Sequence, residues 1–272
     1  MGCVISSSIA LPPDPKHAAQ ELAASKIAIP LAPLGSLECA HSPDQPKVGW
    51  FASDQSLLVS FGDEITPAAN DRVRRLLHLL QSDRVLAVVN LHPAYCSLLV
   101  RFDALSIGHD ELEAILRSYV ARMEEAPIPE PREVEIPVCY GGEFGPDLDE
   151  LAAMHGMTSE EATALHTSTT YTACFLGFVP GFAYLAGLPE SLATPRLATP
   201  RRKVPAGSVG IAGNQTGVYP CSTAGGWRLI GRTPYAMFRP SEGHMSLISI
   251  GDRVRFRQIT PGEFAKLSDT CA

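Results

Sequence analysis

Seven positively charged side chains lie in a window of the chain that contains no acidic residue and no histidine. Between Ser191 and Ser241 the window holds Arg196, Arg201, Arg202, Lys203, Arg228, Arg232 and Arg239. Cations without nearby acids repel one another unless an anion or another part of the protein neutralises them. Arginine binds carboxylate and phosphate groups in bidentate fashion, so the window indicates an anion site. Charge alone supports equally well a set of solvated arginines with one or two structural ion pairs.

The densest part of the window is ATPRLATPRRKVPAGS, Ala193–Ser208. Its prolines would hold a loop close to its binding geometry and lower the cost of ordering it. The glycine-rich stretch GSVGIAGNQTG, Gly207–Gly217, could bring backbone N–H groups to an anion. Glycines between strands more often form turns, and we favour that interpretation for this stretch.

No single residue stands out as a catalyst. The chain contains no P-loop motif GxxxxGK[ST], no GxSxG nucleophile motif and no CxxC or HExxH metal motif, so neither a P-loop nor a metal site is expected. We interpret Cys174 as buried and inert, and His155 and His166 as helix-end residues. The catalytic residues therefore stay unknown at this stage.

The bulk composition is that of a globular cytoplasmic protein. The chain has 272 residues, of which 45% are hydrophobic and 19% charged, and its net charge is −7. An acidic balance argues against nucleic-acid binding, and no apolar run is long enough to span a membrane. Seven cysteines without paired spacing indicate reduced thiols. Gly2 and Cys3 fit a lipidation pattern, which we interpret as a chance match.

The first half of the chain predicts an extension and then a ferredoxin-like α+β domain. Residues 1–46 are rich in Pro, Ala and Ser and are interpreted as a disordered N-terminal extension. Residues 47–124 show a β-α-β-β-α pattern that one further strand would close, as in the split βαβ arrangement. The strands are predicted at Ser56–Phe61, Val85–Asn90 and Cys96–Phe102, and the helices begin near Pro67 and His109.

A proline-rich linker and a β-rich domain are predicted for the second half. The linker covers residues 125–135, and the β-barrel domain covers residues 136–268. Asp147 with Glu150, and Thr158 with Glu161, fit helix capping boxes. The short apolar runs that follow are typical of a compact barrel: YTACFLGF, SVGIAG, WRLIG, SLISIG and RVRF.

Long linked motifs resemble the allophanate hydrolase subunit 1 family. They are GFVPGFAYLAGL, Gly177–Leu188; the segment Ala193–Pro220 that contains the arginine window's densest part; and GGWRLIGRTPYAMF, Gly225–Phe238. The stretches PAYCSLLVRFD and IPVCYGGEFGPDLDELA fit as well, and the resemblance runs from about Val48 to Leu267. Ala224 stands where the family usually has proline, and Ser53-Asp54 replaces a Gly-Asp pair.

The resemblance implies a cyclophilin-like barrel after the linker and an enzyme that works only as a complex. The family includes component B of the bacterial 5-oxoprolinase, whose other subunits are a homologous component C and a component A. Such a complex opens the lactam of 5-oxoproline to glutamate with ATP and Mg²⁺, the nucleotide being shared between subunits. The resemblance also implies two alternatives: a non-catalytic module that inhibits a sensor histidine kinase, and a relative of the carboxyltransferase part of urea carboxylase.

Under the enzyme interpretation, the substrates 5-oxoproline and ATP are both anions, and we expect the arginine window to bind them. The residues predicted to bind substrate or anion are Arg196, Arg201, Arg202, Lys203, Gln215 and Arg232. Those predicted to line the pocket are Phe182, Tyr184, Tyr219 and Trp227.

Deletion of residues 1–46 should leave the melting temperature nearly unchanged, because this segment contributes little patterned apolar surface. Differential scanning calorimetry of the full and truncated chains measures this directly. A drop of many degrees would show that the segment packs on a domain.

Overall fold

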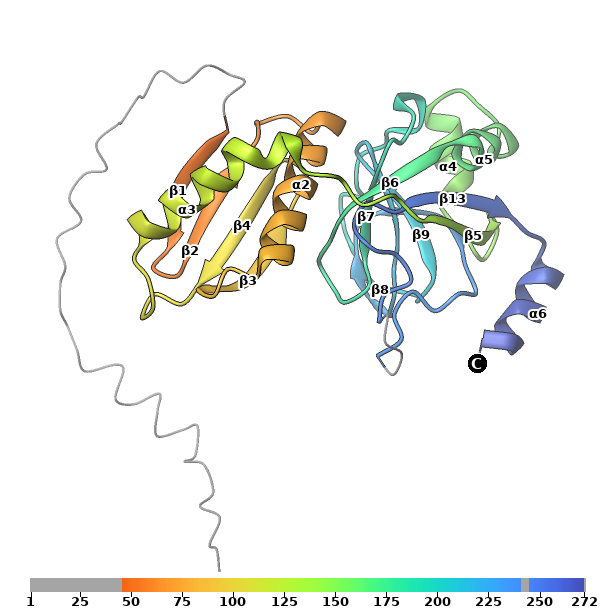
Figure 1. Cartoon of the computed structure of the whole chain (residues 1–272). Coiled ribbons are helices and arrows are strands. Elements are labelled where there is room, and N and C mark those ends of the chain that lie inside the picture. The colour runs from red at the N-terminus through yellow and green to blue at the C-terminus, as the bar shows by residue number, and fades with distance from the viewer. Residues whose placement is uncertain (1–45, 241–244, 272) are drawn as a thin grey trace, which may run out of the picture. The chain divides into compact units, whose positions relative to one another are not determined.

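The computed structural model describes residues 46–240 and 245–271, which Figure 1 traces from an α+β layer to a closed barrel along the chain. The mixed α and β class and the barrel are confirmed. The predicted extension, with its Gly2 and Cys3 pattern, lies outside the described residues except for Pro46.

The α+β layer is a four-stranded antiparallel sheet with two helices, and its strand order is β1-β2-β4-β3. Its elements are β1 (Lys47–Ser53), β2 (Ser56–Ser60), α2 (Pro67–Asp83), β3 (Val88–Pro93), β4 (Ser97–Phe102), α3 (His109–Arg122) and the 3₁₀ turn η1 (Met123–Glu125).

Helix α2 begins and packs as its sequence predicts. The Thr66 hydroxyl accepts a hydrogen bond from the Ala69 N–H at 3.1 Å, and Pro67 occupies the first turn, where no N–H partner is needed. Its buried stripe is Val73, Leu76, Leu77 and Leu80, which joins the core formed with Leu57, Val59, Leu98 and Val100 of the sheet.

Two predictions for this layer are wrong in position. The strand that completes the sheet is β1, which precedes β2, whereas the sequence predicted it after the second helix. After that helix the chain forms η1 and then contains no helix or strand over residues 126–132. The second strand begins at Val88 rather than Val85, because Arg84 ends α2 in the left-handed conformation, φ 44°, and a turn follows. The ferredoxin-like class and the domain boundaries stay predictions; β5 begins at Glu133, inside the predicted linker.

The barrel has seven strands in the order β10-β7-β6-β13-β5-β12-β9, and β9 pairs with β10 to close it. Only the pairing of β13 with β5 is parallel among the described barrel pairs. The strands are β5 (Glu133–Tyr140), β6 (Thr170–Leu176), β7 (Ala183–Ala186), β9 (Ser208–Ala212), β10 (Gln215–Val218), β12 (Arg228–Arg232) and β13 (Arg253–Gln258).

A small ribbon and three helices accompany the barrel. The ribbon pairs β8 (Arg201–Val204) with β11 (Thr223–Gly225), and η2 (Glu190–Leu192) precedes it. Helices α4 (Leu148–Met154) and α5 (Ser159–Ser168) lie together beside the barrel, and α6 (Pro261–Cys271) follows the last strand (Figure 1). The run SLISIG, predicted as a strand, forms a turn instead, because the Ser249 N–H bonds to the Asp252 carboxylate at 2.7 Å.

His166 lies in the last turn of α5, as expected for a helix-end residue, but it is fully buried and bonds to side chains of two barrel strands instead of serving the helix end as a cation. Its ring stacks on Phe256 at 4.6 Å between centroids. Its Nε2 lies 3.1 Å from the Thr216 hydroxyl, which itself donates to the Gly210 carbonyl, so Nε2 carries the proton. Nδ1 then accepts from the Tyr140 hydroxyl at 2.8 Å. These contacts leave no acid beside the ring to stabilise a second proton.

Stability should fall in acid through His166. Burial lowers the pKa of His166 to about 3, whereas an unfolded histidine titrates near 6.5. Between these two values the unfolded chain binds one proton more, so the free energy of unfolding should fall by about 1.4 kcal/mol for each unit of decreasing pH. Urea denaturation from pH 7 to pH 4 should show a shallower fall for His166→Gln. Parallel pH profiles for the two proteins would contradict this assignment.

Candidate functional site

The loop that carries Arg196 is tied to the barrel at both ends. Thr194 exchanges two backbone hydrogen bonds with Gly213, at 2.7 and 3.2 Å, at the turn between β9 and β10. Further along, the Leu197 N–H donates to the Gly226 carbonyl at 2.8 Å, and the Arg228 Nε donates to the Pro195 carbonyl at 3.3 Å. The prolines and these bonds together hold the loop against the β8–β11 ribbon.

The four predicted pocket residues form one aromatic cluster. The Phe182 ring lies edge-on to Tyr184, Tyr219 and Trp227 at centroid distances of 4.9, 5.3 and 5.4 Å. Phe182, Tyr219 and Trp227 are buried, and Tyr184 is half-buried. The four rings therefore lie together and most of their surface serves as core, while their predicted role in lining a substrate pocket stays a prediction.

Two arginines lie beside the cluster in the fold: Arg201 pairs with Gly225, against which the Tyr219 hydroxyl packs, and the Arg196 loop bonds to Gly226 through the Leu197 N–H. Burial raises the pKa of Tyr184, and the charge of Arg196 opposes that rise. Burial also raises the pKa of Tyr219, opposed by the Trp227 backbone and by the charges of Arg196 and Arg201. Both phenols consequently stay protonated at neutral pH and can donate hydrogen bonds to an anion. We call Tyr184, Arg196, Arg201 and Tyr219 the arginine–tyrosine site.

Arg201 has an acidic partner from outside the acid-free window, which agrees with the alternative of one or two structural ion pairs. Its Nη2 donates to Oδ1 of Asp147 at 2.5 Å. The other oxygen, Oδ2, accepts the Leu229 N–H at 2.6 Å, and the Asp147 N–H returns a bond to the Leu229 carbonyl at 2.9 Å. The Asp147 side chain is 6% exposed. The second terminal nitrogen of the Arg201 guanidinium, Nη1, is buried and has no hydrogen-bond partner in the described part of the chain.

The predicted capping box of α4 is absent, and its two acids hold arginines instead. Asp147 makes no side-chain capping bond to the helix. Glu150 lies 2.9 Å from Nη1 of Arg228, so the first turn of α4 neutralises two cations of the window. By contrast, the Thr158–Glu161 capping box of α5 is confirmed. The sequence prediction did not include Asp147 and Glu150 among the site residues. The signal that could have identified them is that two acids lie close together before a window of seven cations that contains no acid.

Three cations of the predicted site keep their charge uncompensated. Arg196, Arg202 and Lys203 are exposed, and no carboxylate among residues 46–240 and 245–271 pairs with them. These side chains, with the Nη1 group of Arg201, are suited to an anionic substrate or to nucleotide phosphates. In the part of the chain that the structure describes, no group of His, Cys, Asp or Glu residues could hold a metal ion.

Two predicted anion-binding residues lie apart from this site. The Arg232 guanidinium lies over the rings of Phe144 and Phe264, at 5.0 and 5.4 Å, at the far end of β12 from Arg228. Gln215 begins β10 and pairs with Ala212, next to the turn with Gly213. Neither residue has a contact that joins it to Arg196 or Arg201 in the described structure.

The glycine-rich stretch is a hairpin and not an anion-binding loop. Its residues form β9 and β10, whose paired residues run from Gln215 opposite Ala212 to Val218 opposite Val209. The Gly207 N–H donates to the Tyr219 carbonyl at 2.7 Å. Because these backbone groups are used in pairing, the turn-forming interpretation is confirmed.

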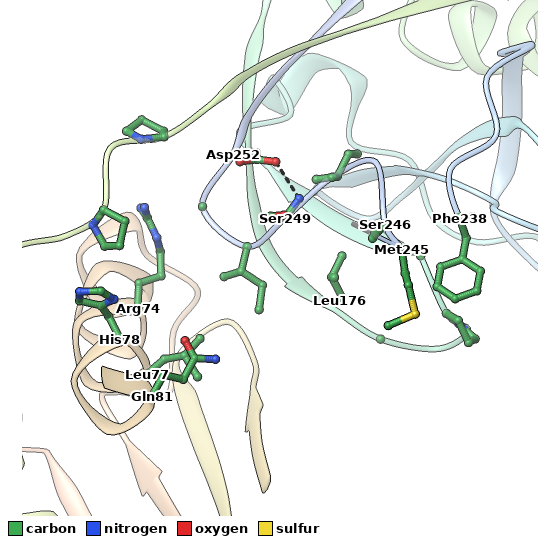
Figure 2. A pocket seen from close by; sticks show the side chains of 18 of the residues that line it. Arg74, Leu77, His78, Gln81, Leu176, Phe238, Met245, Ser246, Ser249 and Asp252 are labelled. Atoms are coloured by element: carbon green, nitrogen blue, oxygen red, sulfur yellow. Dashed lines mark hydrogen bonds between the residues drawn. The ribbon is translucent and has the colours of Figure 1, made fainter. Parts of the chain in front are cut away.

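Figure 2 shows a separate cavity of about 780 Å³, whose lining includes Leu176, Phe238, Met245 and Asp252. The Asp252 carboxylate is already bonded to the Ser249 N–H, as drawn, and to Nε of Arg132 at 3.0 Å. None of the described residues that line this cavity belongs to the predicted site. The Asp252 carboxylate therefore serves the fold.

Comparison with known proteins identifies the family. The family model "Carboxyltransferase domain, subdomain C and D" matches residues 50–248. The chain is 41% identical over 223 residues to component B of the 5-oxoprolinase of Bacillus subtilis (strain 168), which covers 78% of this chain and 92% of that protein. It is 42% identical over 208 residues to component B of the 5-oxoprolinase of Escherichia coli O157:H7, covering 76% and 94%. The chain therefore belongs to the family of these 5-oxoprolinase subunits, the allophanate hydrolase subunit 1 family that its motifs predict.

Solved structures share the fold. The protein TTHA0988 is 34% identical and aligns with a TM-score of 0.68 over 76% of this chain and 40% of its own. Urea carboxylase of Kluyveromyces lactis aligns with a TM-score of 0.69 over 85% of this chain and 23% of its own, at 20% identity. The second likeness concerns the fold alone, and in both cases this chain spans less than half of the larger protein. No helix of the described residues is long and apolar enough to cross a membrane.

Gly225 makes room for the Tyr219 side chain, and this gives a test of the aromatic cluster. A Cβ at Gly225 would overlap the Tyr219 hydroxyl and lie 2.9 Å from its ring carbons. Gly225→Ala should therefore displace Tyr219 and lower stability by about 1–3 kcal/mol. Gly226→Ala is the matched control, since its Cβ would meet only Pro200, at 3.6 Å. Near-ultraviolet circular dichroism and thermal denaturation compare the two; equal behaviour would contradict the packing described.

Proposed function

We propose that this chain is component B of an ATP-dependent 5-oxoprolinase complex. The observation that carries the proposal is its identity of 41–42% with proteins named as that 5-oxoprolinase subunit, over nearly their whole length. Their name points to further subunits, and the family resemblance supplies a homologous component C and a component A as the partners. Cytoplasmic location forms part of the same proposal.

The physical chemistry of the reaction agrees with the arginine–tyrosine site. A five-membered lactam is a poor electrophile, because its amide resonance is retained and its ring carries little strain. Transfer of the terminal phosphoryl group of ATP to the lactam oxygen converts that oxygen into a leaving group. Water then adds to the carbon and the C–N bond breaks, which leaves an acyl phosphate on the side chain of glutamate. A second water hydrolyses this acyl phosphate, so that the products are glutamate, ADP and phosphate. Both substrates are anions, which Arg196, Arg202 and Lys203 are suited to attract.

The charged residues of this chain indicate which part of substrate binding it performs. Its described cations fit the phosphate and carboxylate groups of the substrates. We therefore assign anion binding to this chain. The two protonated phenols, Tyr184 and Tyr219, would donate hydrogen bonds to a bound oxygen.

Reconstitution tests the proposal. The isolated chain should form no glutamate from 5-oxoproline, and addition of components A and C should give glutamate formation that depends on ATP. Activity of the single chain, or inactivity of the assembled mixture, would refute it. An assembled mixture without turnover would favour the alternative of a binding module.

Arg196→Ala tests the site within that complex. A hydrogen bond to a charged group is worth about 1.5–3 kcal/mol, so kcat/KM should fall about 10- to 100-fold. Because Arg196 is exposed and unpaired in the described structure, the melting temperature should not change. Arg101→Ala, on the exposed side of β4, is the control and should leave turnover intact. Arg201→Ala is a poorer test, since it strands the buried Asp147 charge at a cost of about 3–5 kcal/mol.

A further inference from the structure

We infer that Asp147 is a positioning residue that turns Arg201 toward the bound anion, an inference that rests on the proposed function of this site. Asp147 holds one side of the guanidinium group, Nη2, at 2.5 Å. The opposite side, Nη1, is buried and has no partner among the described residues. One half of the planar fork is thus fixed to the protein, and the other half is left for a ligand.

The carboxylate that does this is itself fixed by the backbone. Its Oδ2 accepts the Leu229 N–H at 2.6 Å, and the Asp147 N–H donates to the Leu229 carbonyl at 2.9 Å. Asp147 is 6% exposed, so it cannot turn away without losing its bonds to Leu229 and Arg201 in a site sheltered from water. The orientation of Arg201 is consequently tied to β12.

The arrangement also determines how an anion can be bound. A guanidinium whose Nη2 side is occupied cannot present both Nη groups to one carboxylate. Arg201 would contact one oxygen of the ligand through Nη1, near the phenol of Tyr219, which packs against Gly225, the strand partner of Arg201. Arg196 is exposed, and its loop bonds to Gly226 through the Leu197 N–H, so it remains free to bind a second oxygen. The site therefore fits an anion with separated oxygens held between two arginines.

A lysine could not replace Arg201 in this role. Its ammonium group could pair with Asp147 and would keep the buried charge compensated, but it has no second planar edge to offer the ligand. The structural alternative is that the pair serves only folding. The two interpretations differ in what happens to turnover per assembled molecule.

The closing experiment uses a double-mutant cycle of Asp147→Asn and Arg201→Gln in the reconstituted complex, with Asp149→Asn as the control. Asp149 lies in the same helix turn, is exposed and bonds to Ser159. We expect Asp147→Asn to lower kcat/KM at least 10-fold and to cost nothing further when Arg201 is already Gln. Additive losses, or an unchanged kcat/KM per assembled complex, would overturn the inference.

A second measurement does not depend on turnover. In the isolated chain with isotope-labelled arginine, the two Nη signals of Arg201 should be resolved and should average in Asp147→Asn. Titration with inorganic pyrophosphate should shift the Nη1 signal of the unmodified chain at concentrations at least 10-fold lower than in the variant. Averaged signals in the unmodified chain, or equal titrations, would overturn the inference even where the complex proves to be no 5-oxoprolinase.

Where Asp147→Asn fails to fold, Arg201→Lys keeps the inference testable. This variant retains a cation beside Asp147 and should keep the melting temperature while losing at least 10-fold in kcat/KM. Full turnover with lysine would show that the free edge of the fork is not used.

Discussion

The buried carboxylate of Asp147 is the group on which the site depends. It joins the start of α4 to β12 through the Leu229 backbone, and it joins both to the ribbon through Arg201. A charge in such a sheltered position is tolerated only when it is paired and hydrogen-bonded. Here each oxygen has its own donor. Asp147 therefore bonds to the barrel and to the ribbon from the start of the helix.

The charge of the arginine window is distributed by the same fold. Helix α4 neutralises Arg201 and Arg228, while Arg232 lies against the rings of Phe144 and Phe264. What remains uncompensated in the described structure is confined to Arg196, Arg202 and Lys203, on the loop and the ribbon. The window thus contains both of the things that its composition allowed: structural ion pairs, and a smaller group of cations available to an anion.

Local patterns predicted the elements whose formation depends on neighbours in the sequence. The Thr66-Pro67 start of α2 and the Thr158–Glu161 capping box are bonded as expected, because their partners lie within one helical turn. Asp147 has the same local pattern and behaves differently, since Leu229 and Arg201 offer it stronger partners from far along the chain. Strand β1 was missed for a related reason. Its pairing with β2 contains register shifts, so its sequence shows no regular alternation.

Sequence by itself determined the family, the barrel and the mixed class. These follow from motifs and from periodicity, which are properties of short segments. Tertiary structure alone decided which arginines are free. An ion pair between residues 54 positions apart, such as Asp147 and Arg201, leaves no trace in local spacing. The same is true of His166 in α5, whose partners Tyr140 and Thr216 come from strands β5 and β10. Long-range desolvation and pairing decide these roles, and only the folded chain brings the groups within reach of one another.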